Sequence, residues 1–380
     1  MASRPVSDAA LSSLRREVRE FLDKEIADGT FVPSSDPQVG GFSREFSRKV
    51  GGRGWIGMTW PARYGGGERS SLERYVVCEE LLASGAPVGA HWSADRQIGP
   101  GLLKYGSEEQ RRFFLPLVTE GRCFFALGFS EPEAGSDLAS IRTRARRTDK
   151  GWVLNGRKIW TSHGHEADYI VVLCRTSDPD PDSRHAGLSQ FFVKLDAPGV
   201  TARPIRTMDG KETFSEVVFE NVRLAENALF GTPGDGWAQM TTELAHERSG
   251  PERFLSAFQL LLQLVRMTSV APSELRSVAI GRMVAHLFTL RQMSYQVAAG
   301  MATGSRPDVS SVLVKDLGTV LEGEMTNLCR LVAPRELGGA IGERFEELLE
   351  QATLAAPSFT LRGGTTEILR GIIARNLGVR

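Results

Sequence analysis

Apolar residues recur every three or four positions through most of residues 1–122, with polar residues between them. The first such stripe runs from Leu11 to Ile26 and follows Ser7, whose short polar side chain favours the N-cap of a helix. Two later stripes follow Ser70 and Ser107. Each of these serines has a Glu or Gln three positions on, which is the spacing of a capping box. We therefore predict an N-terminal helical domain over residues 1–122.

The pattern changes at Cys123, where short runs rich in β-branched and aromatic residues replace the helical stripes. Turn residues separate these runs, and residues 230–236, FGTPGDG, predict a linker. Long helical periodicities return after Trp237. The order predicts an α+β multidomain protein. It would have a central antiparallel β-barrel or sandwich over residues 123–235 and a C-terminal domain resembling a four-helix bundle over residues 236–380.

Composition narrows the classes of partner. Lys plus Arg and Asp plus Glu each total 46, so the chain lacks the basic excess typical of nucleic-acid-binding proteins. No apolar run approaches the roughly 20 residues of a membrane span, and the N-terminus lacks the apolar core of a signal peptide. The four cysteines and six histidines show no metal-ligand spacing. We expect a cytoplasmic protein without a metal, nucleic-acid or membrane partner.

The stretch Phe124–Ser140, FFALGFSEPEAGSDLAS, carries the first candidate chemistry. Its apolar start predicts a buried strand, which Pro132 should end because proline cannot donate a hydrogen bond to a sheet. Gly135 permits a sharp turn that leaves backbone amides beside the Ser136 hydroxyl, an arrangement able to bind an anion. A plain strand followed by a polar turn explains the same residues, so both interpretations stay open here.

Four segments taken together resemble the acyl-CoA dehydrogenase family. They are SEPEAGSDL (Ser130–Leu138), NGRKIWTSHGHEADYIVVLCR (Asn155–Arg175), ENALFGTPGDGW (Glu226–Trp237) and RGGTTEILRGIIARNLG (Arg362–Gly378). A single motif of this kind would be weak. Four in this order, spanning nearly the whole chain, are specific.

This resemblance implies the chemistry of the family. FAD takes a hydride from the β-carbon of an acyl-CoA thioester while a carboxylate removes the α-proton. Such enzymes serve lipid β-oxidation, reduce an acceptor of the electron-transfer flavoprotein type and form tetramers. A thioester carried on a protein rather than on CoA is an alternative substrate. The glycines of residues 338–342, GGAIG, follow a helical pattern rather than a strand, so they predict no dinucleotide fingerprint.

The resemblance assigns seven residues to FAD. Ser130 and Ser162 match positions whose hydroxyls contact the N1/O2 edge and the N5 atom of the flavin, where negative charge grows on reduction. Trp160 matches a ring that stacks on the flavin, although a strand tryptophan is on its own more typical of a core. Thr365 starts the last helix, where simple capping is the alternative. The full set is Ser130, Gly135, Ser136, Trp160, Ser162, Thr365 and Glu367.

The reaction depends on a positioned catalytic base, because the α-proton of a thioester is weakly acidic. The usual family position of the base is Gly363 here. Glycine has no side chain to act as a base, but its backbone N–H would hold the thioester carbonyl. A smaller group of the family carries a glutamate on the first long helix of the bundle, and Glu247 matches that position. Arg248 matches a residue that meets the CoA arm, and Ser136 is assigned to substrate as well as to FAD. A solvated charge cluster is the alternative for Glu247, and a surface ion pair for Arg248.

One region departs from the family pattern. Most members carry an R-x-x-F-G loop in the bundle that reaches the FAD of a neighbouring subunit, and residues 266–282, RMTSVAPSELRSVAIGR, lack it. Pro272 and Ser273 predict a turn and a helix cap instead. Some relatives, including those acting on steroid side-chain thioesters, divide these duties between two unlike subunits, and His91–Arg112 resembles that branch. Three alternatives therefore accompany an acyl-CoA dehydrogenase homotetramer: a heterotetramer, a flavin-poor partner subunit, and a flavin oxidase or monooxygenase.

Overall fold

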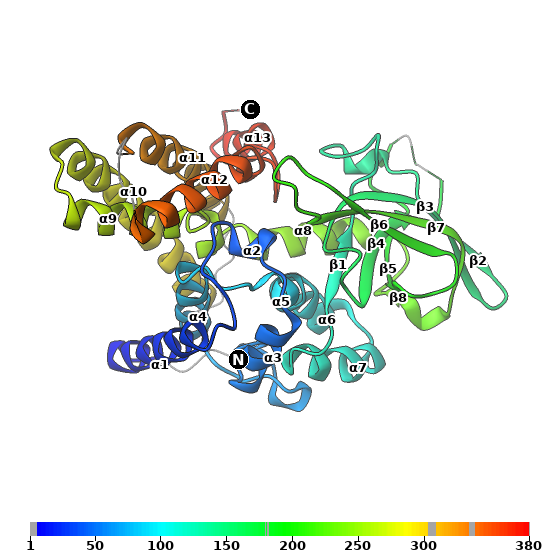
Figure 1. Ribbon diagram of the computed structural model, residues 1–380. Coiled ribbons are helices and arrows are strands. Elements are labelled where there is room, and N and C mark those ends of the chain that lie inside the picture. The colour runs from blue at the N-terminus through cyan, green and yellow to red at the C-terminus, as the bar shows by residue number, and fades with distance from the viewer. Residues whose placement is uncertain (1–5, 179, 181, 303–308, 334–338, 380) are drawn as a thin grey trace. The chain divides into compact units, whose positions relative to one another are not determined.

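The computed structural model of the chain describes residues 6–178, 180, 182–302, 309–333 and 339–379 (Figure 1). For residues 243–247 and 302 it describes the backbone alone. Contacts divide the chain into a helical unit, residues 1–41, 69–88 and 247–380, and a β-unit, residues 42–68 and 89–246. The sequence-based domain boundaries, after residues 122 and 235, stay predictions.

In the helical unit, local capping explains where the N-terminal helices begin. Ser7 caps α1 (Asp8–Ala27) by accepting a hydrogen bond from the amide of Ala10. Ser70 and Glu73 form the predicted capping box at the start of α4 (Ser71–Ala83). The short helix α2 (Pro37–Gly40) lies between them in the sequence. The apolar stripe of α1 is buried as its periodicity predicts, through Leu11, Leu14, Val18, Phe21 and Leu22.

The C-terminal part of this unit is a bundle of long helices, as predicted. In chain order these are α9 (Phe258–Val270), α10 (Glu274–Ala302), α11 (Val309–Val332) and α12 (Ala340–Phe359). The single turn η5 (Pro251–Arg253) precedes them, and α13 (Thr366–Asn376) follows and packs on α11. Helix α4 packs on both α1 and α10, so the first and last parts of the chain share one unit.

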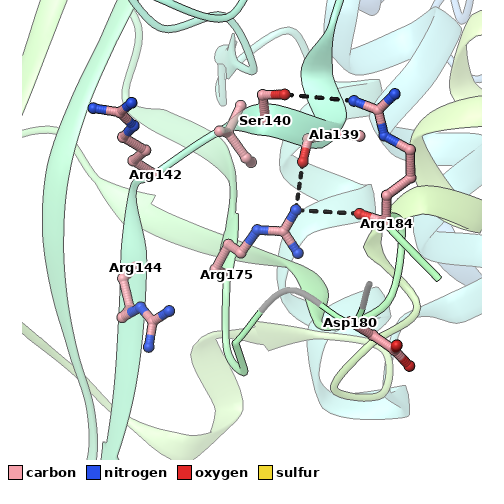
Figure 2. A pocket seen from close by; sticks show the side chains of 8 residues that line it. Ala139, Ser140, Arg142, Arg144, Arg175, Asp180 and Arg184 are labelled. Atoms are coloured by element: carbon pink, nitrogen blue, oxygen red, sulfur yellow. Dashed lines mark hydrogen bonds between the residues drawn. The ribbon is translucent and has the colours of Figure 1, made fainter. Parts of the chain in front are cut away.

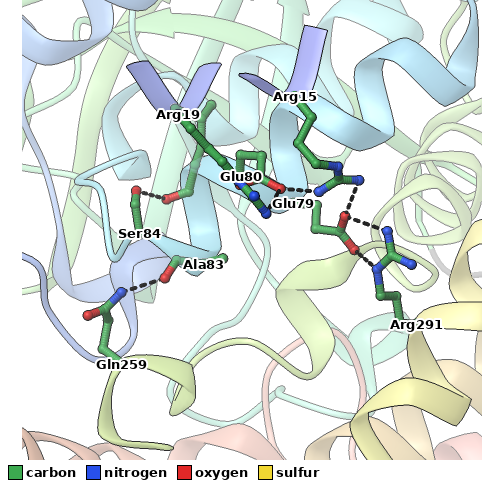
Figure 3. Close-up of polar contacts among 9 residues, drawn as sticks. Arg15, Arg19, Glu79, Glu80, Ala83, Ser84, Gln259 and Arg291 are labelled. Atoms are coloured by element: carbon green, nitrogen blue, oxygen red, sulfur yellow. Dashed lines mark hydrogen bonds and ion pairs between the residues drawn. The ribbon is translucent and has the colours of Figure 1, made fainter. Parts of the chain in front are cut away.

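Paired charges join α1, α4 and α10 (Figure 3). The adjacent carboxylates of Glu79 and Glu80 are both buried on α4. Arg15 of α1 forms ion pairs with both of them, and Arg19 binds Glu80 with its Nε 2.7 Å from the carboxylate. Arg291 of α10 closes the network at 2.7 Å from Glu79. Because each buried carboxylate has a guanidinium partner, the network holds three helices together without leaving a charge uncompensated.

One open sheet of described strands forms the centre of the β-unit (Figure 1). Its order is β6-β7-β3-β2-β4-β5-β8, with β1 paired to β4 off that path. Most neighbours are antiparallel, but β4 runs parallel to β1 and β2. The β-domain is thus confirmed, while the sheet is mixed and does not close into a barrel. The bounds are β1 (Phe125–Gly128), β2 (Arg144–Thr148), β3 (Gly151–Ser162), β4 (Tyr169–Arg175), β5 (Leu188–Lys194), β6 (Val200–Ile205), β7 (Phe214–Leu224) and β8 (Leu229–Phe230).

Inward-facing residues of these strands form the main core of the β-unit, with Trp152, Leu154, Phe191 and Phe219 at its centre. Gln110 joins the core strands to a helix, since its side-chain amide donates to two carbonyls beside β8 at 2.8 Å. The helices of this unit are α3 (Arg44–Gly52), α5 (Gly89–Ser93), α6 (Gly99–Tyr105), α7 (Glu108–Thr119) and α8 (Gly236–Glu247), with the short turns η1 (Ala62–Tyr64), η2 (Ala94–Ile98), η3 (Leu138–Ser140) and η4 (Glu226–Ala228).

Two kinds of feature are absent from the described residues. None of the helices there has both the length and the apolar character that a bilayer-crossing segment needs. No three His, Cys, Asp or Glu side chains in the same part of the chain gather in a way that could hold a metal ion.

Candidate functional site

The loop after β1 exposes a row of backbone donors. Glu131 and Ala134 close a tight turn by exchanging backbone hydrogen bonds, at 2.9 and 3.0 Å. The amides of the next three residues, Gly135 to Asp137, donate to no acceptor within the described part of the chain. A Cβ atom added at Gly135 would meet nothing within 4 Å, so open space borders this loop. The loop therefore offers an anion successive N–H groups and the exposed Ser136 hydroxyl.

A buried ion pair fixes the residue that precedes this turn. The Nζ of Lys158, on β3, lies 2.8 Å from a carboxylate oxygen of Glu131 and donates to the carbonyl of Phe129 at 3.0 Å. Ile159 donates its amide to the carbonyl of Ser130 at 3.0 Å. Lys158 thus binds both neighbours of Ser130, and β3 holds Ser130 itself.

Electrostatics explain why these charges persist in the interior. Burial would raise the pKa of Glu131, but the charge and hydrogen bond of Lys158 outweigh it and lower that pKa. The backbone amides of Arg142 and Thr143 also donate to the carboxylate, at 2.7 and 2.9 Å. Burial lowers the pKa of Lys158, and Glu131 opposes that shift. The Lys158–Glu131 ion pair therefore holds the loop after β1 in place.

Trp160 occupies a strained, exposed position at the bulge of β3. Its φ is 57°, a left-handed conformation that bulky residues rarely adopt. The pairing of β3 with β7 slips between Lys158 and Thr161, which is how the strand accommodates it. The residue is 56% exposed, so the alternative of a core tryptophan is wrong. Strain of about 1–3 kcal/mol that presents a large aromatic face to the outside is typical of a ligand site.

The hydroxyls beside Trp160 are available to a ligand. Ser162 is half-buried, and its side chain has no hydrogen-bond partner in the described residues. The Thr161 hydroxyl is buried and likewise lacks a partner there. His163, in contrast, is engaged, since its Nδ1 lies 2.7 Å from a carboxylate oxygen of Glu166. With Ser130 and Ser136, these residues make the β-unit part of the candidate site.

In the helical unit, Gly363 lies against two cationic side chains. Gly363 and Gly364 have φ values of 70° and 105°, which side-chain-bearing residues rarely adopt. A Cβ atom at Gly363 would lie 3.1 Å from the guanidinium of Arg253 and 3.1 Å from the Cε of Lys315. The Nζ of Lys315 donates to the carbonyl of Gly364 at 2.8 Å. Gly363 therefore provides no carboxylate. A carboxylate introduced at this position would lie beside Arg253 and Lys315 and would form an ion pair rather than act as a free base.

Arg248 connects the end of α8 to this glycine pair. Its Nε donates to the carbonyl of Gly363 at 3.3 Å. Glu247, the residue before it, is the last residue of α8, and its side chain lies outside the described residues. The backbone thus brings the end of α8 to the Gly363 turn.

The residue before the glycine pair is held by a second buried network. Arg362 lies 2.5 Å from a carboxylate oxygen of Asp36 and donates to the Ser256 hydroxyl at 2.7 Å. Glu322 accepts from the amide of Ser256 at 2.7 Å, and burial raises its pKa despite the opposing charge of Arg362. This network anchors one end of the Gly363 turn to α11 and to the segment before α2.

The other end of the turn begins α13. Thr365 caps this helix by accepting from the amide of Ile368 at 3.5 Å, so the capping alternative is confirmed for its hydroxyl. Glu367 is exposed in the first turn, and the hydrogen bonds of its own amide and of Thr365 lower its pKa. Both lie next to Gly363 and Gly364 in the sequence. Their assignment to FAD stays a prediction.

The predicted residues thus fall into two groups. Ser130, Gly135, Ser136, Trp160 and Ser162 gather on the β-unit, whereas Glu247, Arg248, Gly363, Thr365 and Glu367 belong to the helical unit. The β-unit group fits a flavin nucleotide chemically, because it combines an exposed aromatic face, unpartnered hydroxyls and free backbone amides among the described residues.

The sequence analysis did not identify the buried charged residues that hold the site residues of the two units in place. Lys158 shares the alternation of Trp152 and Leu154 along β3, so the period of two could have placed it inward. Lys315 and Glu322 are seven residues apart on α11, on the face that also buries Val312 and Met325. A charged residue on a predicted buried face was the available signal.

The sequence matches three family profiles. They are "Acyl-CoA dehydrogenase, N-terminal domain" over residues 9–122, "Acyl-CoA dehydrogenase, middle domain" over residues 126–222, and "Acyl-CoA dehydrogenase, C-terminal domain" over residues 234–378. Acyl-CoA dehydrogenase FadE26 of Mycobacterium tuberculosis is 30% identical over 381 residues, which cover 95% of this chain and 94% of that protein.

Two solved structures share the fold. The structure of the Tcur3481-Tcur3483 steroid ACAD superposes with a TM-score of 0.84 and 29% identity, over 98% of each chain. The ChsE4-ChsE5 complex from Mycobacterium tuberculosis superposes with a TM-score of 0.82 and 28% identity, over 99% of each chain. Since the profiles, the FadE26 match and the fold agree over nearly the whole length, the chain belongs to the acyl-CoA dehydrogenase family, whose members are FAD-dependent oxidoreductases.

Proposed function

We propose that this chain catalyses the α,β-dehydrogenation of an acyl-CoA thioester with Glu247 as the base. The surroundings of Gly363 carry this proposal. Gly363 and Gly364 both have positive φ and carry no side chain, and Gly363 lies against Arg253 and Lys315, so this turn offers no base. Arg248 binds the carbonyl of Gly363, which brings the backbone next to Glu247 to the same turn. A carboxylate from the end of α8 is the candidate that fits this arrangement.

Each group has a distinct task in this reaction. FAD, when bound, accepts the hydride from the β-carbon of the substrate. The carboxylate of Glu247 receives the α-proton. This transfer requires a raised pKa of the Glu247 carboxyl group, which in turn requires that the acyl chain exclude water. The amide of Gly363 donates to the thioester carbonyl and stabilises the charge that develops on it. Arg248 and Ser136 bind the CoA arm.

On the β-unit, the chain holds the cofactor. The Ser130 and Ser162 hydroxyls would donate to the flavin ring, and Trp160 would offer it an aromatic face. Gly135 and Ser136 offer amides and a hydroxyl to the pyrophosphate, and Thr365 and Glu367 contribute from the start of α13. The hydroxyls of Ser130, Ser136 and Ser162, unpartnered among the described residues, support these assignments.

A bulky, steroid-type acyl chain is the substrate class that we propose to test first. One of the similar solved structures is that of a steroid ACAD, and that protein is 29% identical over 98% of this chain. The test is a panel of acyl-CoAs, from short straight chains to steroid side-chain thioesters, with a dye as electron acceptor. An electron-transfer flavoprotein is the proposed natural acceptor in the cytoplasm. Fastest turnover with a short straight chain would refute the substrate proposal.

The base is tested by Glu247→Gln beside Glu243→Gln, one turn earlier on α8. We expect Glu247→Gln to lower turnover by about 10²- to 10⁴-fold, the range of general-base catalysis, and Glu243→Gln to retain it. Anaerobic bleaching of the flavin by substrate, with slow reoxidation in air, separates a dehydrogenase from a flavin oxidase or monooxygenase. Wild-type turnover in Glu247→Gln would overturn the base assignment.

We also propose assembly with an unlike homologous subunit. Residues 266–282 form the end of α9, a Ser273-capped turn and the start of α10, without the cross-subunit motif. Helix α10 exposes apolar side chains, with Leu275, Val278 and Phe288 between 61% and 66% exposed. The ChsE4-ChsE5 structure is of a complex. Expression alone against co-expression with a neighbouring homologue tests this, and a yellow, active tetramer from the lone chain would refute it.

A further inference from the structure

The glycine pair before α13 keeps its shape through contacts with other segments. Gly363 and Gly364 have φ values of 70° and 105°, and glycine has no side chain to restrict its backbone. The amides of both residues donate to no acceptor within the described part of the chain. Their carbonyls, in contrast, each accept a hydrogen bond from a cationic side chain. The turn is therefore held by its carbonyls, and its N–H groups stay available to a ligand.

Lys315 makes the shorter of these two hydrogen bonds. Its Nζ lies 2.8 Å from the carbonyl oxygen of Gly364, whereas the Nε of the half-buried Arg248 lies 3.3 Å from that of Gly363. Lys315 is fully buried, and α11, which carries it, packs on α9, α10, α12 and α13. Because the helix bundle fixes its aliphatic stem, Lys315 is the more rigid of the two contacts.

The β-unit shows what such a contact does to irregular backbone. Arg175 is only 3% exposed and donates to the carbonyl of Ala139 and, at 3.2 Å, to that of Arg184 (Figure 2). These bonds join two segments that are far apart in the sequence, so a buried cation supports the backbone there. Lys315 has the same relation to the turn of Gly363 and Gly364.

The geometry of the peptide group links the Lys315 bond to the direction of the amides. A peptide unit is planar and trans, so its C=O and N–H point in opposite directions. The bond from Lys315 fixes the plane that joins Gly364 to Thr365. On the other side of the turn, Arg362 is anchored by its ion pair and hydrogen bond. The amide of Gly363 lies between these two anchors, so its direction depends on both.

We propose that Lys315 is a positioning residue for the reaction, because its bond to Gly364 keeps the amide of Gly363 directed at the thioester carbonyl. The inference rests on the proposed function, which assigns this amide to the substrate. A hydrogen-bond donor stabilises developing charge best when it is already oriented, since no reorganisation is then needed during the reaction. Without the bond, the two adjacent glycines let the amide turn away, and a misplacement of about 1 Å costs roughly 10²-fold in rate.

Lys315→Met tests the inference, because it removes the donor and keeps most of the apolar stem. We expect kcat per bound FAD to fall by about 10- to 100-fold with KM nearly unchanged, since the hydrogen bond to the thioester strengthens mainly in the transition state. Arg370→Gln is the matched control. It removes a cation of α13 that pairs with Asp316, the neighbour of Lys315, at 3.3 Å and that makes no bond to the turn among the described residues. We expect this control to keep the wild-type kcat.

Infrared spectroscopy of a bound thioester separates a positioning role of Lys315 from a merely structural one. A hydrogen bond weakens the thioester C=O bond and lowers its stretching frequency. Enoyl-CoA with an isotope-labelled carbonyl, bound to the FAD-loaded protein, should show a smaller downshift in Lys315→Met than in the wild type or Arg370→Gln. A merely structural lysine would change the yield of FAD-loaded protein but not this downshift. If Lys315→Met binds no FAD, Lys315→Gln, whose side chain is too short for the same bond, carries the same expectation.

The outcomes distinguish this inference from the proposed function. Wild-type values of the downshift and of kcat per bound FAD in the Lys315 variants would overturn the inference and leave dehydrogenation intact. The absence of any downshift in the wild type would overturn it as well. If the wild type oxidises no thioester, but the downshift of bound enoyl-CoA is present and the Lys315 variants lose it, the proposed function fails and the role of Lys315 stands.

Discussion

The buried pair of Lys158 and Glu131 should decide both the stability of the β-unit and its affinity for FAD. Lys158→Met keeps the length and apolar stem of the side chain but removes its charge. The variant loses the 2.8 Å ion pair to Glu131 and the 3.0 Å bond to the carbonyl of Phe129. The Glu131 carboxylate, 7% exposed, is then left buried without a cation.

Removing one partner of a buried pair typically destabilises a protein by about 3–5 kcal/mol. Two backbone amides, of Arg142 and Thr143, still donate to Glu131 in the variant. We therefore place Lys158→Met at the lower end, about 3 kcal/mol. Because Lys158 binds both neighbours of Ser130, we also expect weaker FAD binding, about 10-fold in Kd if one flavin hydrogen bond is lost.

Urea unfolding followed by tryptophan fluorescence measures the stability, and flavin titration of the apoprotein measures the affinity. Lys150→Met, in the exposed turn between β2 and β3, is the matched control, and we expect it to change stability by less than about 0.5 kcal/mol. The double variant Lys158→Met with Glu131→Gln should recover part of the loss, because it no longer buries an unpaired charge. A double variant no more stable than Lys158→Met would refute this reasoning.

The same pair gives an acid-side pH dependence. The folded-state pKa of Glu131 lies below its ordinary value of 4.5, so its contribution is fully present above pH 4.5 and is lost as pH falls through the lowered pKa. In Glu131→Gln this group no longer titrates, so the acid loss of stability in that window should become smaller. Equal acid slopes for wild type and variant would show that other groups control this window.

Three further predictions concern other residues. Burial lowers the pKa of His91 to about 4, so the free energy of unfolding should fall by about 2 kcal/mol between pH 7 and pH 5, because the unfolded state gains a proton there. His91→Gln should remove most of this pH dependence, as measured by urea unfolding. At position 160, where φ is 57°, Trp160→Gly should be about 1 kcal/mol more stable than Trp160→Ala, and both should lose FAD affinity; equal stabilities would argue against backbone strain. Gly363→Glu should not restore turnover to Glu247→Gln, because Arg253 and Lys315 would lower the pKa of the new carboxyl group and make it too weak a base; recovered turnover would contradict this account of the turn.

The helix starts were predictable from the sequence because their causes are local. Ser7, Ser70 and Ser107 cap the helices that follow them, and each cap joins residues three positions apart. The same holds for the Ser273 turn before α10. The sheet was harder. Its strands were recognisable, but their order depends on pairings such as β1 with β4, which join distant segments and change an antiparallel sheet to a mixed one.

Trp160 shows how a sequence can point to a residue without revealing its local structure. The resemblance placed an aromatic ring there, while the residues alone favoured a core position. Its exposure arises from the bulge between Lys158 and Thr161, where β3 slips against β7. That slip depends on the register of two strands that are far apart in the sequence, and no local pattern encodes it. The sequence could therefore nominate the residue but not its strained backbone.

The surroundings of Gly363 explain more than its identity as a glycine does. In the sequence, a glycine at the usual base position means only that a carboxylate is missing. In the structure, two buried cations from separate elements, Arg253 at the end of η5 and Lys315 on α11, lie beside the position that a Cβ atom would take. Any carboxylate placed there would be neutralised as an ion pair, and its pKa would fall when a base requires it to rise. The turn thus offers backbone carbonyls and amides rather than a base, which is why we propose that Glu247, at the end of α8, abstracts the proton.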